Sequence, residues 1–417
     1  MAAITNTSIR IFVVYALGVM AAMTVSEAVT ELGAIAKEFH LTDHGSVGII
    51  MSLPSLMVVL GALLAGYLVD RIGDRIVLLT GALIIIAGDI AVIAAPAYNL
   101  LLAGRVVTGV GYVLTAVAAV TLLIRMTTGK QRTMVMALWS TFVPASFLLP
   151  FISAGFAEYF QTWRAAFIGH SVLTLVLTLL AALSIPSRTA QEKAMFSRTR
   201  GLSTVLKSPL PYLLGISFAA DAFIQTGMIS SLTPFLARTY AVPPVEVSHW
   251  NVGAMLANAV GCLMVGALLN QGVKAITIAG AGIVLAAASA LLVYLVPIGF
   301  MPAIFASWVF MFSSGLLVGM WALAPMVAPS RESTGATSGL ITQLTLVGVF
   351  LGPPLFIGAM HDGNSQKMAL MVIIGLVACL VALPVWLRGT APRTGKHVAE
   401  NHAEKRSDDS DKLGAIR

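Results

Sequence analysis

Twelve apolar runs, each long enough to cross a membrane, dominate this sequence. A helix needs about 20 apolar residues to span the hydrocarbon core of a bilayer. The chain has 417 residues, of which 58% are hydrophobic and only 10% charged, whereas soluble domains carry about 25% charged residues. Most of this apolar surface must therefore face lipid. We predict an all-α membrane protein with transmembrane helices at residues 9–30, 45–69, 76–96, 98–124, 132–157, 165–186, 209–237, 247–270, 275–297, 300–328, 335–360 and 366–387.

The longest polar interruption divides these runs six and six. We expect an N-terminal six-helix bundle at residues 1–186, a cytosolic linker at 187–208 and a C-terminal six-helix bundle at 209–388. Residues 389–417 are polar and mixed in charge. They cannot bury enough apolar surface to fold by themselves, so we expect a disordered cytosolic tail.

Lysine and arginine are distributed unevenly between the two sides of the predicted membrane. With both termini placed in the cytoplasm, the inner loops and tails hold 20 of the 25 Lys and Arg residues, the outer loops hold four, and Arg105 lies inside a helix. Cytoplasmic loops are enriched in positive charge. We therefore predict that both termini face the cytoplasm, and we place this multi-pass protein in the bacterial inner (plasma) membrane. The net charge of +7 reflects this topology, and no nucleic-acid partner is needed to explain it.

A polar turn between the second and third runs has a degraded copy in the second half. The turn covers residues 66–75, and the copy begins 200 residues later, at Gly266. The leading glycine is kept, whereas Asp70 corresponds to Asn270. Equivalent turns in equivalent places indicate that the two six-helix halves are related by duplication, an arrangement found in secondary transporters.

Three motifs carry a resemblance to a known family. The turn contains Gly66, Asp70, Arg71, Gly73 and Arg75 in the pattern Gly-x-x-x-Asp-Arg-x-Gly-x-Arg, with Asp74 in a position that is usually basic. The fourth run carries Arg105, Gly109 and Gly111, and the sixth begins with Trp163, Arg164 and Phe167. Together they resemble the major facilitator superfamily over nearly the whole chain, in particular its 12-helix, proton-coupled, drug-antiporter-like branch.

The resemblance implies two pseudo-symmetric six-helix bundles that work by alternating access, with helices 1, 4, 7 and 10 lining a central cavity. It also implies that Asp70 meets the N-terminal end of a helix in the other half, where a carboxylate gains about 0.3–1 kcal/mol. We name Gly66, Asp70, Arg71, Gly73 and Arg75 the latch. Because Asn270 has lost the acid, we expect one such latch only.

Charged residues inside the predicted membrane are the strongest functional candidates, because each costs roughly 2.5–3.5 kcal/mol to insert. We expect Glu27, Arg105 and Asp221 to serve proton coupling, since they lie on helices 1, 4 and 7. Asp89 lies on helix 3, which is peripheral in this fold. Glu27 and Asp89 both lie at a depth that would allow pairing with Arg105, and the sequence leaves this choice open. His170 is interpreted as a hydrogen-bonding group between helices.

Softer candidates for substrate binding come from the same helices and from helices 7, 10 and 11. Aromatic and Met side chains at such positions also pack between helices, so this second interpretation stays open. The predicted substrate-binding residues are Arg105, Tyr15, Met23, Tyr112, Gln225, Trp321 and Gln343.

These features predict a secondary active transporter of a small organic solute, acting as a monomer in the lipid bilayer. Motifs of zinc proteases, serine hydrolases and nucleotide-binding loops are absent, so we expect no enzyme, metal or cofactor, and an ion gradient must supply the energy. Protons are favoured as the coupling ion and sodium stays open. Proton-driven efflux by antiport is slightly favoured, although the antiporter motif around Pro150 is degraded. The alternative is proton-coupled uptake of a small organic anion bound by Arg105. The sequence does not identify the substrate.

Overall fold

We describe residues 7–28, 31–41, 44–147, 149, 159–186 and 201–389 of a computed structural model. Within these ranges the chain is helical and contains no strand. Eleven helical stretches are long and apolar enough to span a membrane. The predicted fifth span lies partly outside the described residues. The tail beyond Gly389, most of the linker and the motif around Pro150 also lie outside them. The described end of the linker forms the short helix α10 (Gly201–Lys207).

The helices follow one another with short connections. Their bounds are α1 (Thr7–Ser26), α2 (Leu32–Glu38), α3 (His44–Ile72), α4 (Asp74–Ile93), α5 (Tyr98–Met126), α6 (Gly129–Trp139), α8 (Arg164–Ser184), α10, α11 (Pro209–Tyr240), α12 (Pro244–Asn270), α13 (Ala275–Leu295), α14 (Phe300–Val318), η1 (Gly319–Leu323), α15 (Ala324–Val327), η2 (Arg331–Ser333), α16 (Thr334–His361), α17 (Ser365–Cys379), η3 (Leu380–Ala382) and α18 (Leu383–Arg388).

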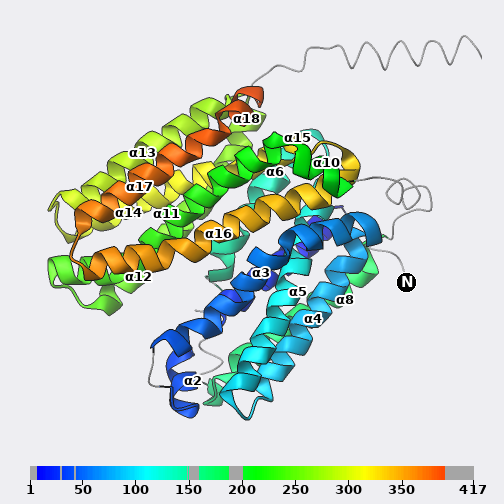
Figure 1. The fold of residues 1–417 in the computed structure, drawn as a ribbon, viewed down its shortest axis with the longest axis horizontal. Helices are drawn as coiled ribbons and strands as arrows, with labels where there is room; N and C mark the ends of the chain where they lie inside the picture. Colours follow the sequence, from blue (N-terminus) through cyan, green and yellow to red (C-terminus); the bar gives the residue numbers. More distant parts are fainter. Residues whose placement is uncertain are drawn as a thin grey trace, which may run out of the picture.

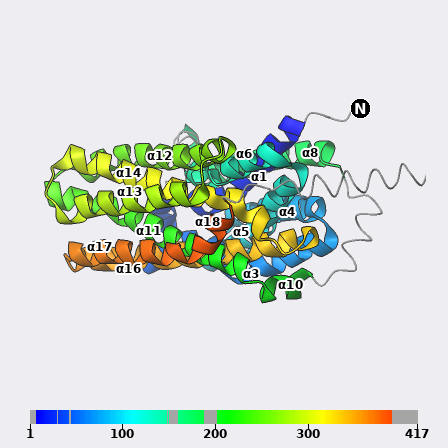
Figure 2. The same ribbon diagram turned by 90° about the horizontal axis from the view of Figure 1, so that it is seen from above.

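Two helical bundles meet along a limited interface. Figures 1 and 2 show α1, α3, α4, α5 and α8 in one bundle and α11 to α14 with α16 to α18 in the other, and α6 contacts elements of both. The bundles touch where α3 lies against α16 and where α6 lies against α12 and η1. They converge at the end that carries α10 and α15 and separate toward α2 and the beginning of α12 (Figures 1 and 2). We refer to the converging end as the latch end, because it carries the turn at residues 66–75.

Glycines allow the bundles to approach closely at this end. A Cβ on Gly66 would lie 2.2 Å from the carbonyl oxygen of Gly335, and a Cβ on Gly339 would lie 2.3 Å from that of Ala62. In the second half, a Cβ on Gly266 would lie 2.6 Å from the Cβ of Ala137. The glycines shared by the turn and its copy therefore have equivalent roles in helix packing.

Two of the predicted continuous spans are interrupted. The expected helix at residues 132–157 turns at Ser140 and Thr141, whose hydroxyls donate to the carbonyls of Ala137 and Leu138. The expected helix at 300–328 changes to a 3-10 turn at η1. Pro325 lies one turn beyond Trp321, and its ring has no N–H to give the Trp321 carbonyl. That carbonyl accepts from Ala324 instead.

Candidate functional site

Asp70 connects the two halves at the latch end. Its carboxylate accepts hydrogen bonds from the backbone N–H groups of Gly335 (2.9 Å) and Ala336 (2.7 Å), in the first turn of α16. These N–H groups have no partner within the helix, and the helix dipole favours an anion there. The contact expected from the resemblance, between Asp70 and the start of a helix in the other half, is present in the structure.

Arg125 completes this contact and was not singled out from the sequence. Its guanidinium lies 2.9 Å from Asp70 and 2.5 Å from Asp74. The acid at position 74, where the family motif is usually basic, thus gives Arg125 a second carboxylate. Arg125 stands at the end of α5, so the bridge ties α5 to the turn between α3 and α4 and holds Asp70 in place.

The remaining latch residues shape the turn itself. Gly73 has a φ of 120°, a conformation that favours glycine, and it precedes α4 directly. Arg75 donates to the carbonyl of Ala182 at 2.8 Å and so ties the turn to α8. Arg71 donates to the Tyr67 hydroxyl at 2.8 Å, on its own helix. These bonds stabilise the N-terminal half, whereas Asp70 and Gly66 lie against the start of α16 in the other half.

The copy in the second half keeps a weaker version of the same contact. The side-chain amide of Asn270 donates to the backbone carbonyl of Lys130, 3.1 Å away, at the start of α6. The expectation of a single charged contact agrees with this geometry, but the copy also makes a hydrogen bond between the halves. A neutral hydrogen bond replaces the carboxylate, so the two pseudo-equivalent contacts between α3 and α16 and between α12 and α6 differ in strength.

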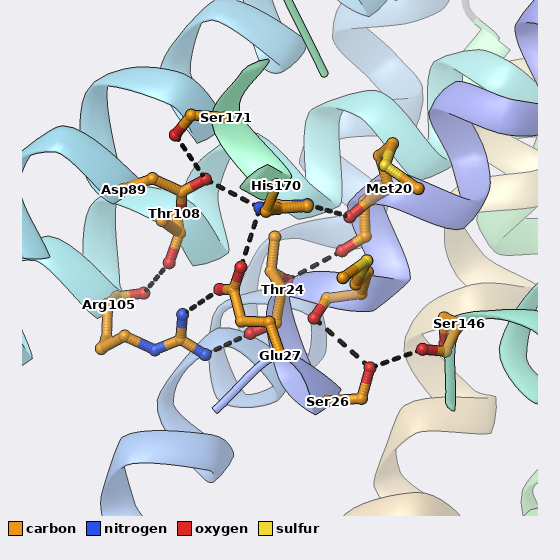
Figure 3. A network of polar contacts seen from close by, with 12 residues as sticks. Met20, Thr24, Ser26, Glu27, Asp89, Arg105, Thr108, Ser146, His170 and Ser171 are labelled. Carbon is orange, nitrogen blue, oxygen red and sulfur yellow. Dashed lines mark hydrogen bonds and ion pairs between the residues drawn. The ribbon is translucent and has the colours of Figure 1, made fainter. Parts of the chain in front are cut away.

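A buried polar network lies inside the N-terminal bundle (Figure 3). The side chains of Arg105 and Glu27 are fully buried and form an ion pair. Arg105 also donates to the carbonyl of Thr24 and, at 2.9 Å, to that of Ile50. The choice that the sequence left open is thus decided, because Arg105 pairs with Glu27 and not with Asp89.

Both carbonyls that receive Arg105 are ones that a helix leaves without a partner. Thr24 lies in the last turn of α1, where no backbone N–H of the same helix is available to donate to the carbonyl groups. Ile50 lies four residues before Pro54 in α3, and proline has no N–H to offer it. The local sequence therefore leaves two carbonyl acceptors that a planar guanidinium can reach together and that a compact lysine ammonium would not.

His170, from α8, links Glu27 to Asp89 of α4. Its Nδ1 lies 2.8 Å from Glu27 Oε2 and 2.7 Å from Asp89 Oδ2, and its Nε2 lies 2.9 Å from the carbonyl oxygen of Met20. Ser171 donates to Asp89 Oδ2 at 3.2 Å. The expectation that His170 bonds between helices agrees with this geometry, but its partners are two acids.

Glu27, Asp89 and His170 bring three potential ligand atoms within 4.8 Å of one another. Carboxylate and imidazole suit several divalent ions. However, the Arg105 cation is already bonded to Glu27, and it would repel a second cation at that point. The donor spacings are also those of ordinary hydrogen bonds. We therefore interpret the group as a proton-binding cluster, and assign no metal there.

The motif at the start of α8 supports the network from the outer side of the bundle. Arg164 forms two hydrogen bonds with Glu38, of 2.9 and 2.7 Å, and the Trp163 indole donates to the same carboxylate. One turn further, the ring of Phe167 lies 5.6 Å from the Arg105 guanidinium. These contacts fix the rotation of α8, and with it the position of His170.

Asp221 is the corresponding buried acid of the C-terminal bundle. It is 1% exposed, and its Oδ2 accepts a 3.0 Å hydrogen bond from Ser314 of α14. Its other oxygen has no hydrogen-bond partner in the described part of the chain. A buried carboxyl group with one oxygen left unpartnered is costly, which makes Asp221 a candidate functional residue of this bundle.

A cavity of about 120 Å³ lies between the two halves. Six aromatic side chains line it: Tyr112, Trp139, Phe142, Phe147, Phe218 and Trp321. Its polar groups are hydroxyls and amides, from Ser55, Ser140, Ser146, Gln225, Thr226, Asn258, Thr342 and Thr345. No described residue in this lining carries a formal charge. The interruptions at Ser140 and at η1 both contribute to the wall.

The predicted site residues divide between this cavity and the bundle interiors. Tyr112, Gln225 and Trp321 line the cavity. Glu27, Arg105 and Asp221, which we expected on the cavity wall, are instead turned into their own bundles, and Ala22, Val25 and Ala222 of the same segments face the cavity. In a chain that is apolar on every face of its helices, the polar side chains are stabilised by meeting one another inside the bundle.

The other three substrate-binding candidates also lie outside the cavity lining. The Tyr15 hydroxyl bonds to Thr141 at 2.7 Å, where the interrupted fifth span turns. Met23 is buried in the core of α1. Gln343 accepts a 3.1 Å hydrogen bond from the backbone N–H of Leu63, across the contact between α3 and α16. These three residues thus contribute to helix packing rather than to the cavity lining.

Comparison with known proteins identifies the family. The model of the Major Facilitator Superfamily matches residues 11–353. The chain belongs to the Major Facilitator Superfamily. The predicted family, the all-α membrane fold and the assignment as a transporter rather than an enzyme are thereby confirmed.

Curated relatives of this superfamily member are transporters. The 2-nitroimidazole transporter of Escherichia coli K12 is 24% identical over 376 residues, which cover 87% of this chain and 90% of that protein. The arabinose-proton symporter of the same strain is 28% identical over 153 residues, which cover 37% of this chain but only 32% of the symporter. Among solved structures, the E. coli fucose:proton symporter has a TM-score of 0.72 at 15% identity, covering 93% of this chain and all of that one. The human organic anion transporter MFSD10 has a TM-score of 0.69 at 12% identity, covering 91% and 99%.

Arg125 and the link from Glu27 to Asp89 through His170 are what sequence reasoning missed in this superfamily member. A signal for the second was available, since Glu27, Asp89 and His170 all fall on membrane helices where isolated polar groups are costly. Arg125 carried no such signal, because it was counted among the basic residues of an inner loop.

Proposed function

We propose that this protein is a proton-coupled symporter of a small, uncharged organic solute, working by alternating access around the central cavity. The observation that carries the proposal is the cavity itself, which takes its lining from both bundles and contains aromatic faces, hydroxyls and amides without a charged side chain among the described residues. Binding sites of this composition orient a ligand through a few polar groups while apolar contacts supply most of the affinity.

The geometry opposes the alternative of anion uptake through Arg105. The guanidinium is fully buried, and it is bonded to Glu27 and to the carbonyls of Thr24 and Ile50. An anionic substrate would have to displace all three. Among the described lining residues, the cavity also offers no carboxylate that would favour a cationic drug. An uncharged solute with a flat or ring-shaped face suits Trp139, Tyr112 and Trp321 better.

Coupling to protons is assigned to the acids behind the cavity wall. Ser26 precedes Glu27 and donates to the carbonyl of Ser146, a cavity residue, at 2.8 Å. Protonating Glu27 would remove the charge that holds Arg105 and so loosen α1 against α5. Asp221 occupies the analogous place behind Ala222 and Gln225 in the C-terminal half. We propose both acids as proton-coupling residues, with Arg105 as the partner that senses the charge of Glu27.

Symport is preferred to efflux for two reasons. The preference for efflux rested on acids that face the cavity, and Glu27 and Asp221 do not line it. Two of the matched proteins are named as proton symporters. The latch acts in the conformational step, because Asp70 holds the bundles together at one end and must release α16 when the cavity opens there.

The deciding experiment measures transport in proteoliposomes with labelled arabinose and labelled 2-nitroimidazole under an imposed proton gradient. We expect an inward gradient to accelerate uptake of at least one of the two, and Glu27→Gln to abolish the acceleration while solute exchange continues. Glu246→Gln is the matched control, because Glu246 is exposed in the first turn of α12 and lies outside the buried network. Expulsion of solute driven by inward proton flow would instead establish antiport. Transport that does not respond to the gradient would contradict proton coupling.

We also propose that the latch end and both termini face the cytoplasm of a bacterial inner membrane. Exposed positions at the two ends provide the test. Gln271 lies in the turn after α12 at the latch end, and Lys367 lies at the opposite end, in the first turn of α17. In whole cells a membrane-impermeant maleimide should label Lys367→Cys and spare Gln271→Cys. The reverse pattern would invert the topology.

A further inference from the structure

We propose that Glu27, His170 and Asp89 form one proton-binding unit that always holds at least one proton, and that His170 transfers a proton between the two carboxyl groups. This inference rests on the proposed proton coupling. It adds a second carboxyl group and a histidine to Glu27, the proton-coupling acid proposed for the N-terminal bundle. Figure 3 shows the three side chains together, with His170 between the acids.

The hydrogen bond to Met20 determines one ring nitrogen of His170. A backbone carbonyl can only accept, and the Met20 oxygen lies 2.9 Å from Nε2. Nε2 must therefore carry a hydrogen. In a neutral imidazole this leaves Nδ1 as a bare acceptor, so the protonation of Nδ1 is the open question at this site.

Two acid oxygens face that nitrogen. Glu27 Oε2 lies 2.8 Å from Nδ1 and Asp89 Oδ2 lies 2.7 Å from it. With no proton on any of the three atoms, three electron-rich atoms would stand at hydrogen-bond distance inside a fully buried site. A proton on Nδ1, on Glu27 or on Asp89 turns at least one of these contacts into a hydrogen bond. The geometry therefore requires a proton within the unit.

The balance of charges also indicates that the unit holds one proton. The titratable side chains grouped here are Glu27 after α1, Asp89 of α4, Arg105 of α5 and His170 of α8. Arg105 contributes one positive charge and the two carboxylates two negative charges. One proton held by the unit makes the network neutral, which is the favoured state away from water. A second proton makes it cationic, and it weakens the bond between Glu27 and Arg105 only while it stays on Glu27.

This arrangement allows a proton to move without rotation of the histidine ring. When a proton reaches Glu27 Oε2, Nδ1–H of His170 gives its proton to Asp89 Oδ2, and Nδ1 then takes the proton from Glu27. The total charge is unchanged, Nε2 keeps its hydrogen, and Glu27 becomes ionised again beside Arg105. The unit can thus store a proton while the ion pair stays intact.

The first test needs no substrate and is a nitrogen NMR measurement on the full-length protein labelled at histidine. We expect one histidine with hydrogen on both ring nitrogens, or with a strongly hydrogen-bonded Nδ1 accompanied by the infrared band of a buried carboxylic acid. The signal should disappear in His170→Gln and persist in Ser171→Ala. A bare Nδ1 without any protonated acid would overturn the proposal, even in a protein whose transport depends on protons.

The second test is the pH profile of transport. His170→Gln and Asp89→Asn should each shift the profile of proton-driven uptake and lower its maximal rate at least about tenfold, with no further loss in the double variant. Solute exchange at equal pH should continue. Equal losses of both activities would indicate a structural role and contradict the proposal. Stabilisation by micromolar zinc that is lost in His170→Gln would show a metal site instead. If uptake by the unmodified protein ignores the gradient, the proposed function fails, and the NMR result still decides the protonation of the unit.

Discussion

Asp70 and Ala336 are 266 positions apart in the sequence, and the Asp70 carboxylate accepts a 2.7 Å hydrogen bond from the Ala336 backbone N–H. Together with the bond from Gly335, it joins the first half of the protein to the N-terminus of α16. The bond is strong because the acceptor is charged and the helix dipole favours that charge. It can be broken and reformed as a unit, which is what a conformational step requires.

Asp70→Asn should slow transport while leaving solute affinity within about tenfold. The amide keeps one acceptor but loses the charge, so the bias toward the conformation closed at the latch end falls by about 0.3–1 kcal/mol or somewhat more. Initial uptake rates and equilibrium binding measured on the same preparation test this. Asp362→Asn is the control, because Asp362 is exposed and pairs with Lys367 at the opposite end of α16. Complete loss of solute binding in Asp70→Asn would contradict the latch.

Gly339→Ala should destabilise the contact between α3 and α16 by about 1–3 kcal/mol, the usual cost of overpacking. The added Cβ would lie 2.3 Å from the Ala62 carbonyl oxygen, so the two backbones must move apart. Gly358→Ala on the same helix meets nothing within 4 Å, and it should be neutral or slightly stabilising. Thermal unfolding in detergent compares the two. Equal melting temperatures would show that close helix approach does not limit stability here.

Trp321→Ala and Gln225→Ala should weaken solute binding by about fivefold or more, whereas Gln343→Ala should leave it nearly unchanged. The first two side chains line the cavity, and loss of an aromatic contact costs about 0.5–1.5 kcal/mol beyond its buried area. Gln343 bonds to the backbone of Leu63 instead, so its loss should appear in the melting temperature. Isothermal calorimetry with the transported solute measures the affinities. A larger affinity loss in Gln343→Ala than in Trp321→Ala would move the binding site away from this cavity.

The stability of the protein should decrease in acid through Glu38, which lies outside the membrane-spanning helices. Hydrogen bonds from Arg164 and Trp163 hold the pKa of Glu38 below its usual value. Since the folded-state pKa is the lower one, the stabilisation is complete above the unfolded pKa of about 4.3 and is lost as pH falls through the folded value. Melting temperatures across this range should fall less in Glu38→Gln than in the unmodified protein. Because Glu38 is largely exposed, we expect a small effect. Identical dependence of melting temperature on pH in Glu38→Gln and the unmodified protein would show that Glu38 does not contribute to acid sensitivity.

The latch shows how far local sequence reaches. Gly66, Asp70 and Gly73 stand in a fixed spacing around a turn, and the turn must lie where two apolar runs meet. Its partner at the start of α16 followed from the family resemblance, and the structure contains that contact. Arg125 did not follow, because its role depends on where α5 ends relative to α4, and no spacing within the sequence reports that distance.

The proton-coupling residues show where sequence reasoning fails. Their depth in the membrane was estimated from helix positions, and Glu27, Asp89, Arg105 and His170 do lie at matching depth. Their direction was not predicted, because these helices are apolar on nearly every side. Lipid and protein interior are similarly apolar, so no amphipathic face tells which side of α1 or α11 looks into the cavity.

The sequence by itself determined the membrane class, most of the apolar spans and the place of the latch, since each depends on run length, composition or short-range spacing. Tertiary structure alone decided that Arg105 pairs with Glu27, that His170 lies between two acids, and that Glu27 and Asp221 leave an uncharged cavity between the bundles. Those outcomes depend on the rotation of each helix about its axis. That rotation is set by close packing at glycines and by polar groups that find partners only when the helices are assembled.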